Sequence, residues 1–130
     1  MAFLLEIHSI LRWIIVVLGL VAILKFLIGW ARKGTFDKMD RGLSSGFSGL
    51  IDLQVTLGLL YLLITGFGGA GFPPYRIEHA VTMLVAAGVA HAPAMLKKAT
   101  NRYAVAFSAV VGTMILVGLG VALLPGGWNR

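Results

Sequence analysis

The sequence predicts an all-α integral membrane protein, a four-helix up-down bundle that forms a single transmembrane domain over residues 1–130. Hydrophobic residues make up 58% of the chain and charged residues only 12%. That is too little polar surface to cover a soluble domain of this length. Four apolar stretches also come close to the ~20 residues with which a helix crosses the hydrocarbon layer. They run over residues 3–30, 47–67, 77–96 and 103–124.

The first stretch, 3–30, is expected to remain in the protein as a transmembrane helix. A cleavable signal peptide starts with basic residues and has a shorter apolar region, whereas this stretch carries Glu6 and His8 near its start. Arg32 and Lys33 follow it and are expected to mark the inner membrane face. Lys25 lies deep in the stretch and is expected to snorkel to the inner headgroups.

The later helices are predicted from their start and stop signals. Asp40 or Ser44 is the expected N-cap of the second helix. Pro93 is expected to bend the inner end of the third helix or to loosen its last turns. The second helix is expected to end in a glycine and proline cluster that forms the outer loop. This cluster comprises Gly66, Gly68, Gly69, Gly71, Pro73 and Pro74.

The basic residues are unevenly distributed, and they predict the orientation of the chain. Under the positive-inside rule, the first and third connections are cytoplasmic and both termini lie outside. This placement accounts for the net charge of +6 without a nucleic-acid partner. The inner basic residues are Arg32, Lys33, Lys38, Arg41, Lys97, Lys98 and Arg102, and the outer ones are Arg76 and Arg130.

Two histidines are predicted to lie at the same depth near the outer face. His8 is about five residues into the first helix and His79 about two into the third, so at ~1.5 Å per residue their depths agree within a few Å. In an up-down bundle these helices are diagonal, with axes roughly 11–14 Å apart, a span that two imidazoles and a central iron fill. Arg12 and Arg76 are candidates to bind haem propionates.

His8 and His79 are therefore candidate axial ligands of a b-type haem. The chain has no cysteine, which excludes thiolate ligands, iron–sulfur clusters and thioether-linked haem. Two other interpretations of the pair stay open. One is a non-haem metal site or a quinone-headgroup site, and the other is polar packing in which the histidines are solvated or hydrogen-bonded.

A second polar group is predicted toward the inner face. Asp52 and Gln54 lie in the inner part of the second helix, and His91 lies twelve residues beyond His79, ~18 Å deeper. We expect Asp52 and His91 to share a level. An Asp–His pair can take up a proton or hydrogen-bond a quinone carbonyl. The alternative is a structural hydrogen bond that joins the second and third helices.

Four short motifs contain most of these residues: His8-Ser9-x-x-Arg12-Trp13, Gly29-Trp30, Asp52-x-Gln54-x-x-Leu57-Gly58-Leu59-x-Tyr61 and Arg76-x-Glu78-His79-x-x-x-Met83. Over nearly the whole chain this pattern resembles a family of small four-helix bacterial membrane proteins that are often labelled cytochrome b-like. The resemblance implies a bundle with haem b as its cofactor. His8 and His79 match the histidine positions of the motifs, whereas His91 falls outside them.

We expect a multi-pass protein of the bacterial cytoplasmic membrane that carries electrons between the quinone pool and a partner, with haem b held by His8 and His79. Little of the chain protrudes from the bilayer, which favours an electron-transfer or accessory subunit over a stand-alone enzyme. Membrane lipid, a larger membrane complex and further copies of the chain are the expected partners. Two alternatives stay open: a cofactor-free structural or assembly subunit, and a quinone site that uses Asp52 and His91.

Overall fold

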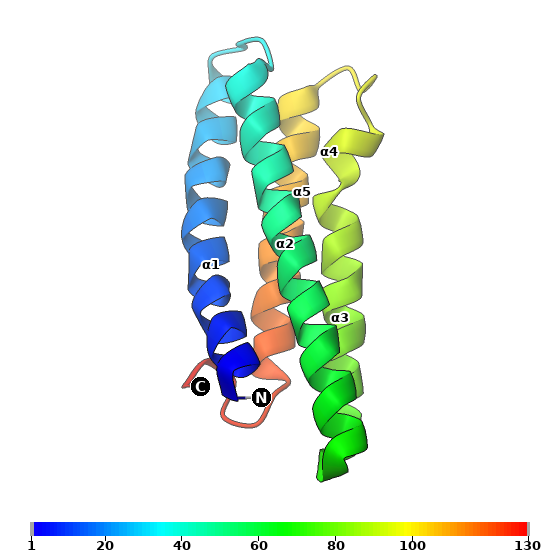
Figure 1. Ribbon diagram of the computed structural model, residues 1–130. Helices are drawn as coiled ribbons and strands as arrows, with labels where there is room; N and C mark the ends of the chain where they lie inside the picture. Colours follow the sequence, from blue (N-terminus) through cyan, green and yellow to red (C-terminus); the bar gives the residue numbers. More distant parts are fainter. Residues whose placement is uncertain (1, 130) are drawn as a thin grey trace.

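The computed structural model describes residues 2–129, and every regular element in that range is a helix (Figure 1). The predicted all-α class is therefore confirmed. Met1 and Arg130 lie outside the described residues, and Arg130 was one of the two basic residues assigned to the outer side. The elements are α1 (Ala2–Ala31), α2 (Lys38–Thr65), the π-helical η1 (Gly66–Ala70), α3 (Pro74–Ala90), α4 (Ala92–Met95), α5 (Arg102–Ala122) and η2 (Gly127–Asn129).

Three helical segments are long and apolar enough to cross a membrane: Ala2–Ala31, Lys38–Ala70 and Arg102–Ala122. The stretch predicted as a helix over 77–96 is divided near its inner end, where the sequence predicted that Pro93 would bend or loosen the helix. Here α3 has 17 residues and ends at Ala90, and the short α4 follows the turn at His91. Pro93 is the physical cause, because its ring lacks an amide hydrogen and crowds the carbonyl four residues earlier.

The helices α1, α2, α3 and α5 lie side by side, and successive ones run in opposite directions (Figure 1). The main contacts join α1 to α2 and α5, and α3 to the same two helices. Consequently α1 and α3 face each other across the group. Both ends of the chain lie at the same end of the molecule (Figure 1).

Close contact between α1 and α5 depends on glycines. A Cβ atom added at Gly19 would lie 2.6 Å from Met114 Sδ, and one added at Gly29 would overlap the ring of Tyr103. Because glycine lacks a Cβ atom, it lets two helices in lipid approach closely. The wholly buried Phe26 fills the space between these two contacts along α1.

The start of α2 differs from the prediction. Asp37 is the N-cap, in place of Asp40 or Ser44, and α2 begins nine residues before the apolar stretch at Phe47. The Asp37 side chain accepts a hydrogen bond from the Asp40 amide at 3.1 Å, and the Asp40 carboxylate accepts one from the Asp37 amide at 3.1 Å. This reciprocal capping box satisfies two amides that the first turn would otherwise leave unpaired.

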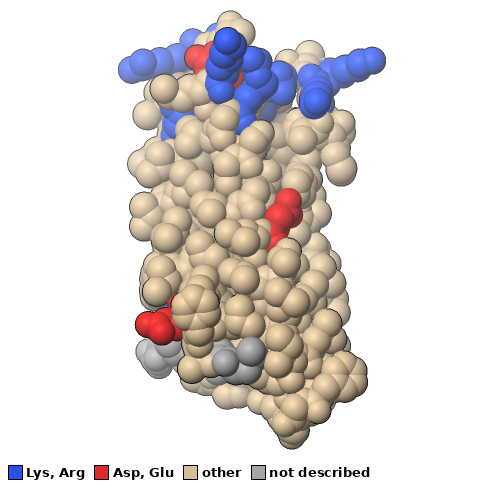
Figure 2. Space-filling model, in the orientation of Figure 1, with Lys and Arg blue, Asp and Glu red and all other residues tan. Residues whose placement is uncertain are grey.

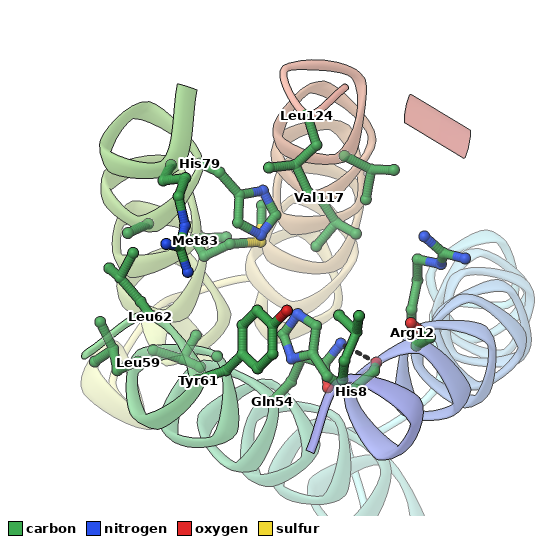
Figure 3. A pocket seen from close by; sticks show the side chains of 18 of the residues that line it. His8, Arg12, Gln54, Leu59, Tyr61, Leu62, His79, Met83, Val117 and Leu124 are labelled. Atoms are coloured by element: carbon green, nitrogen blue, oxygen red, sulfur yellow. Dashed lines mark hydrogen bonds between the residues drawn. The ribbon is translucent and has the colours of Figure 1, made fainter. Parts of the chain in front are cut away.

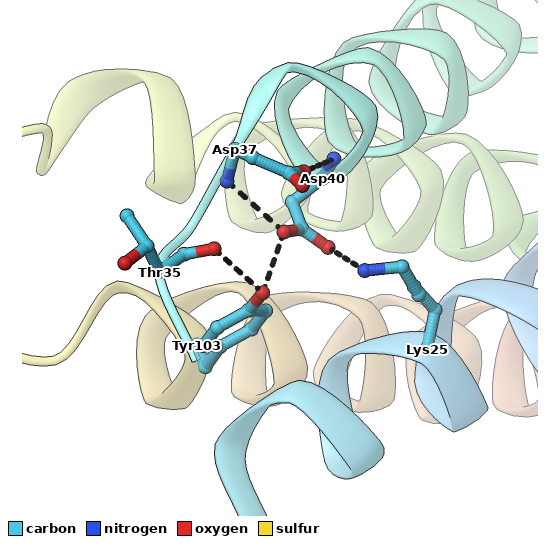
Figure 4. Close-up of polar contacts among 5 residues, drawn as sticks. All are labelled: Lys25, Thr35, Asp37, Asp40 and Tyr103. Atoms are coloured by element: carbon cyan, nitrogen blue, oxygen red, sulfur yellow. Dashed lines mark hydrogen bonds and ion pairs between the residues drawn. The ribbon is translucent and has the colours of Figure 1, made fainter. Parts of the chain in front are cut away.

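Asp40 also joins three helices, as Figure 4 shows. Lys25 of α1 donates a hydrogen bond to Asp40 Oδ1 at 2.7 Å, and the Tyr103 hydroxyl of α5 lies 2.6 Å from Oδ2 and 3.0 Å from the carbonyl oxygen of Thr35. The Asp40 side chain is fully buried. The expectation that Lys25 snorkels to the headgroups is wrong, because a buried carboxylate requires a counter-charge within reach.

Lys and Arg side chains gather at one end of the molecule, as Figure 2 shows. They come from the connection between α1 and α2, the connection between α4 and α5, and the adjoining ends of these helices. This basic end lies opposite the two termini (Figures 1 and 2). Between the two ends, the surface consists largely of exposed apolar side chains, among them Val17, Leu24 and Ile115.

The ion pair between Lys25 and the buried Asp40 carboxylate can be tested by mutation. Lys25→Met should lower the free energy of unfolding by about 3 kcal/mol, because Asp40 keeps a buried charge without its partner. The double variant Lys25→Met/Asp40→Asn should recover much of that loss. Unfolding titrations in detergent micelles measure both effects. Lys97→Met, at an exposed position, is the control, and a Lys25→Met loss no larger than the control's would contradict the proposed pairing.

Candidate functional site

A cavity of about 400 Å³ lies between α1, α2, α3 and α5 (Figure 3). This volume lies in the range of small-molecule and cofactor sites. Most lining residues are apolar, and the polar ones converge from three different helices. They are His8, Ser9 and Arg12 from α1, Gln54, Tyr61 and Thr65 from α2, and Tyr75, Arg76 and His79 from α3.

His8 and His79 face each other across this cavity from α1 and α3 (Figure 3). Their ring centroids are 6.5 Å apart, and the ring planes meet at 75°. The structure thus brings together the two side chains for which the sequence predicts a common depth. The two residues are 71 positions apart in the chain, so this contact depends on the packing of the helices.

The imidazole of His79 is oriented by the backbone of α5. Its Nδ1 atom lies 2.7 Å from the carbonyl oxygen of Gly120, so Nδ1 carries the hydrogen and the lone pair belongs to Nε2. Histidines that ligate metals commonly donate their second N–H to a carbonyl in this way. A side chain at Gly120 would overlap Met83, which explains why α3 and α5 meet at a glycine.

The imidazole of His8 is held by α2. Gln54 Nε2 donates a hydrogen bond to the His8 carbonyl oxygen at 2.7 Å, and a Cβ atom at Gly58 would lie only 3.0 Å from His8 Cε1. Within residues 2–129, the buried atoms His8 Nδ1 and Gln54 Oε1 have no hydrogen-bond partner. Buried polar atoms of this kind are uncommon in folded proteins, and both residues line the cavity.

Two arginines place positive charge on the cavity wall. The Arg12 guanidinium lies 5.1 Å from the ring centroid of Trp13 and 5.5 Å from that of Trp128, so two indoles hold it by cation–π contacts. Arg76 donates hydrogen bonds to the Gly71 carbonyl oxygen, at 2.8 Å, and to the Thr65 hydroxyl. Both side chains are thereby fixed at the cavity, where they would attract an anionic group.

The glycine cluster after α2 builds the Arg76 contact, and it does not form a simple loop as the sequence suggested. The helix continues as the π-helical η1 over Gly66–Ala70. Gly69, within η1, and Gly71, directly after it, have φ angles of +123° and +74° and turn the chain. Only glycine adopts these φ values readily, and the turn carries the Gly71 carbonyl to the Arg76 side chain.

The structure separates the second predicted polar group, Asp52, Gln54 and His91, into two parts. His91 Nε2 lies 2.7 and 3.0 Å from the two carboxylate oxygens of Asp52, and both side chains are partly exposed on the outer surface of α2 and α3. Gln54 lies apart from them, in the cavity beside His8. Residues two apart on a helix differ by ~200° in direction, which explains why Asp52 and Gln54 point to opposite sides of α2.

Sequence reasoning did not include Tyr61, Gly120 and Trp128 in the site. Tyr61 lines the cavity and lies under the Arg76 guanidinium, 5.9 Å from ring centroid to Cζ. Gly120 and Trp128 act on the site from α5 and η2, through the contacts with His79 and Arg12. These contacts join residues that are far apart in the chain, and no pattern in the sequence predicts them.

No protein-family model, curated protein or solved structure matches the chain. Within residues 2–129, no three His, Cys, Asp or Glu side chains lie close enough together to hold a metal ion. The candidate site therefore consists of a histidine pair, two arginines and apolar walls. A proposed function has to explain these three features together.

Gly58 tests how closely the site is packed around His8. Gly58→Leu should displace the His8 ring and lower the free energy of unfolding by about 1–3 kcal/mol through overpacking. Gly46→Leu is the matched control on the same helix, because a Cβ atom there meets nothing within 4 Å. Histidine side-chain NMR shifts and unfolding titrations would show the difference. Equal effects of the two variants would contradict the described packing.

Proposed function

We propose that the protein is a small b-type cytochrome of the bacterial cytoplasmic membrane, with haem b held between His8 and His79. In this proposal it carries electrons between the quinone pool and a partner in a larger membrane complex. The observation that carries the proposal is the 6.5 Å distance between the two imidazole centroids.

That distance is compatible with two imidazoles that share a metal ion. Metal–nitrogen bonds of ~2 Å, together with the ~1 Å from each nitrogen to its ring centre, separate the two centroids by roughly 6–6.5 Å. The Gly120 carbonyl holds Nδ1 of His79 and so leaves Nε2 as the ligand atom. His8 has a buried ring nitrogen without a partner among the described residues, which also supports metal ligation.

The rest of the cavity fits the other parts of a haem. Apolar walls from four helices suit a porphyrin and exclude water, and they influence the reduction potential of a bound iron. Arg12 and Arg76 supply positive charge for two propionates. Haem, when bound, supplies the one-electron chemistry that no side chain in this chain offers.

The alternative of a cofactor-free structural or assembly subunit accounts for less of the site. A structural core is close-packed, and its buried polar atoms are paired. Here a cavity of about 400 Å³ contains two fixed arginines and two buried polar atoms that lack partners within residues 2–129. A bound anionic, apolar group with a metal centre would explain all of these features at once.

We further propose a four-helix up-down membrane bundle with the basic end in the cytoplasm and both termini outside. The fourth span would consist of α3, the turn at His91 and α4. Together these segments cover residues 74–95, or ~33 Å if helical, which is enough to cross the ~30 Å hydrocarbon layer. The gathering of basic residues at the end opposite the termini supports this orientation.

The haem proposal predicts the spectra of three histidine variants. His8→Ala and His79→Ala should each abolish the low-spin bis-histidine spectrum of protein purified or reconstituted with haem, because both axial positions need an imidazole. His91→Ala is the control and should leave the spectrum unchanged. An unchanged low-spin spectrum in His8→Ala or His79→Ala removes that residue from the ligand set.

The orientation proposal predicts the accessibility of single cysteines, since the natural chain has none. In intact spheroplasts, Lys38→Cys should be protected from a membrane-impermeant thiol reagent, and it should react once the membrane is opened. Trp128→Cys, near the opposite end, is the control and should react before opening. Rapid labelling of Lys38→Cys from outside is the result that would reverse the assigned orientation.

A further inference from the structure

Asp52 and His91 form an ionisable pair at an unusual place, on the outward-facing surface of two membrane helices. The side chains of Asp52 and His91 are 49% and 40% exposed. Asp52 lies five residues beyond Phe47, where the apolar stretch of α2 begins, and is therefore ~7–8 Å inside that stretch. Exposed ionisable groups at this depth are costly unless something polar meets them.

Apolar side chains are exposed beside the pair. Leu53 follows Asp52 in α2, and Leu84 and Val85 lie about two turns before His91 in α3; all three are about half exposed. Exposed apolar side chains on a membrane helix face lipid chains. A group that reaches the pair from this side has to dissolve in the hydrocarbon layer.

The charge state of the pair specifies the chemistry of that group. In a medium of low dielectric constant the pair is favoured as a net-neutral unit, because an unpaired charge is expensive there. A neutral pair contains either a carboxylate with an imidazolium or a protonated carboxyl with a neutral imidazole. In both states His91 Nε2 is bonded to Asp52, and Nδ1 carries a hydrogen.

That N–H group is available for a ligand. No residue within 2–129 accepts a hydrogen bond from His91 Nδ1. The helices also leave room beside it: Gly49 and Gly88 each lie three residues before a member of the pair, and a Cβ atom at either glycine would meet nothing within 4 Å. A flat apolar ring with a carbonyl oxygen would fit this surface.

We propose that Asp52 and His91 bind the headgroup of a membrane quinone, with His91 Nδ1–H donating a hydrogen bond to a quinone carbonyl. Asp52 is the positioning residue that fixes the imidazole. The site lies across α2 from the cavity, because Ile51 and Gln54 line the cavity from the same turns. Its place in electron transfer rests on the proposed haem function, whereas quinone binding itself requires no haem.

Photoaffinity labelling with an azido-ubiquinone, in nanodiscs that contain the full chain, tests the proposal directly. Saturable labelling that decylubiquinone competes away should map by mass spectrometry to residues 49–56 and 84–95. His91→Leu should reduce this labelling at least tenfold, because the donor is lost. His91→Gln retains an N–H donor and should keep more labelling than His91→Leu. Leu63→Val, at an exposed position of α2 outside these ranges, is the control and should label as the natural protein does.

Other outcomes would overturn the proposal, and they do so separately from the haem question. Labelling that maps to the cavity, or that does not saturate, excludes a quinone site at this pair even if His91→Leu fails to fold. Loss of labelling together with disulfide-linked dimers of Thr56→Cys would assign the surface to a second copy of the chain. His8→Ala should lose any haem and still bind the quinone, so a failed haem assignment would leave this result intact.

Discussion

The buried carboxylate of Asp40 is the interaction on which the arrangement of the helices depends. It caps the first turn of α2, pairs with Lys25 of α1 and accepts a hydrogen bond from Tyr103 of α5. In a low-dielectric interior each of these bonds is strong, and each would be expensive to lose. Because the partners belong to three helices, the carboxylate fixes how far each helix is displaced along its axis.

This alignment reaches the opposite end of the molecule and determines the candidate site. Lys25 lies 17 residues after His8, ~25 Å along α1, and Asp40 lies 14 residues before Gln54, ~21 Å along α2. The two helices are antiparallel (Figure 1), and the two lengths agree within ~5 Å, so the ion pair at one end and the contact of Gln54 with His8 at the other fit the same relative position of α1 and α2. The hydrogen bond between Gln54 and the His8 carbonyl joins α1 and α2 at the end opposite the Lys25–Asp40 pair. An interaction at the basic end thus helps to position an imidazole in the cavity.

The features that the sequence could predict are those that depend on helix geometry alone. The spacing of His8 and His79 from their helix starts predicts a common depth, because the rise per residue is constant whatever the helix contacts. The N-cap of α2 was predicted at Asp40 or Ser44, too late by at least three residues, because residues 38–46 are mostly polar or glycine and are typical of a connection. They become helical through the Asp37 capping box and the burial of Asp40, which are long-range or reciprocal contacts. The rotation of ~200° between residues two apart on a helix could have predicted that Gln54 and Asp52 point to opposite sides of α2. The Gly120 and Trp128 contacts depend on tertiary packing and could not be predicted in this way.

Two ion pairs within residues 2–129 differ in burial, and this difference supports the separate roles proposed for them. Lys25 and Asp40 meet in the interior, where the carboxylate is fully buried and both of its oxygens are hydrogen-bonded. Asp52 and His91 are as close to each other, yet glycines on both helices leave them uncovered in the middle of an apolar surface. A pair that served only to join α2 and α3 would be more stable if larger side chains shielded it from lipid. The open surface therefore supports the binding site proposed for this pair.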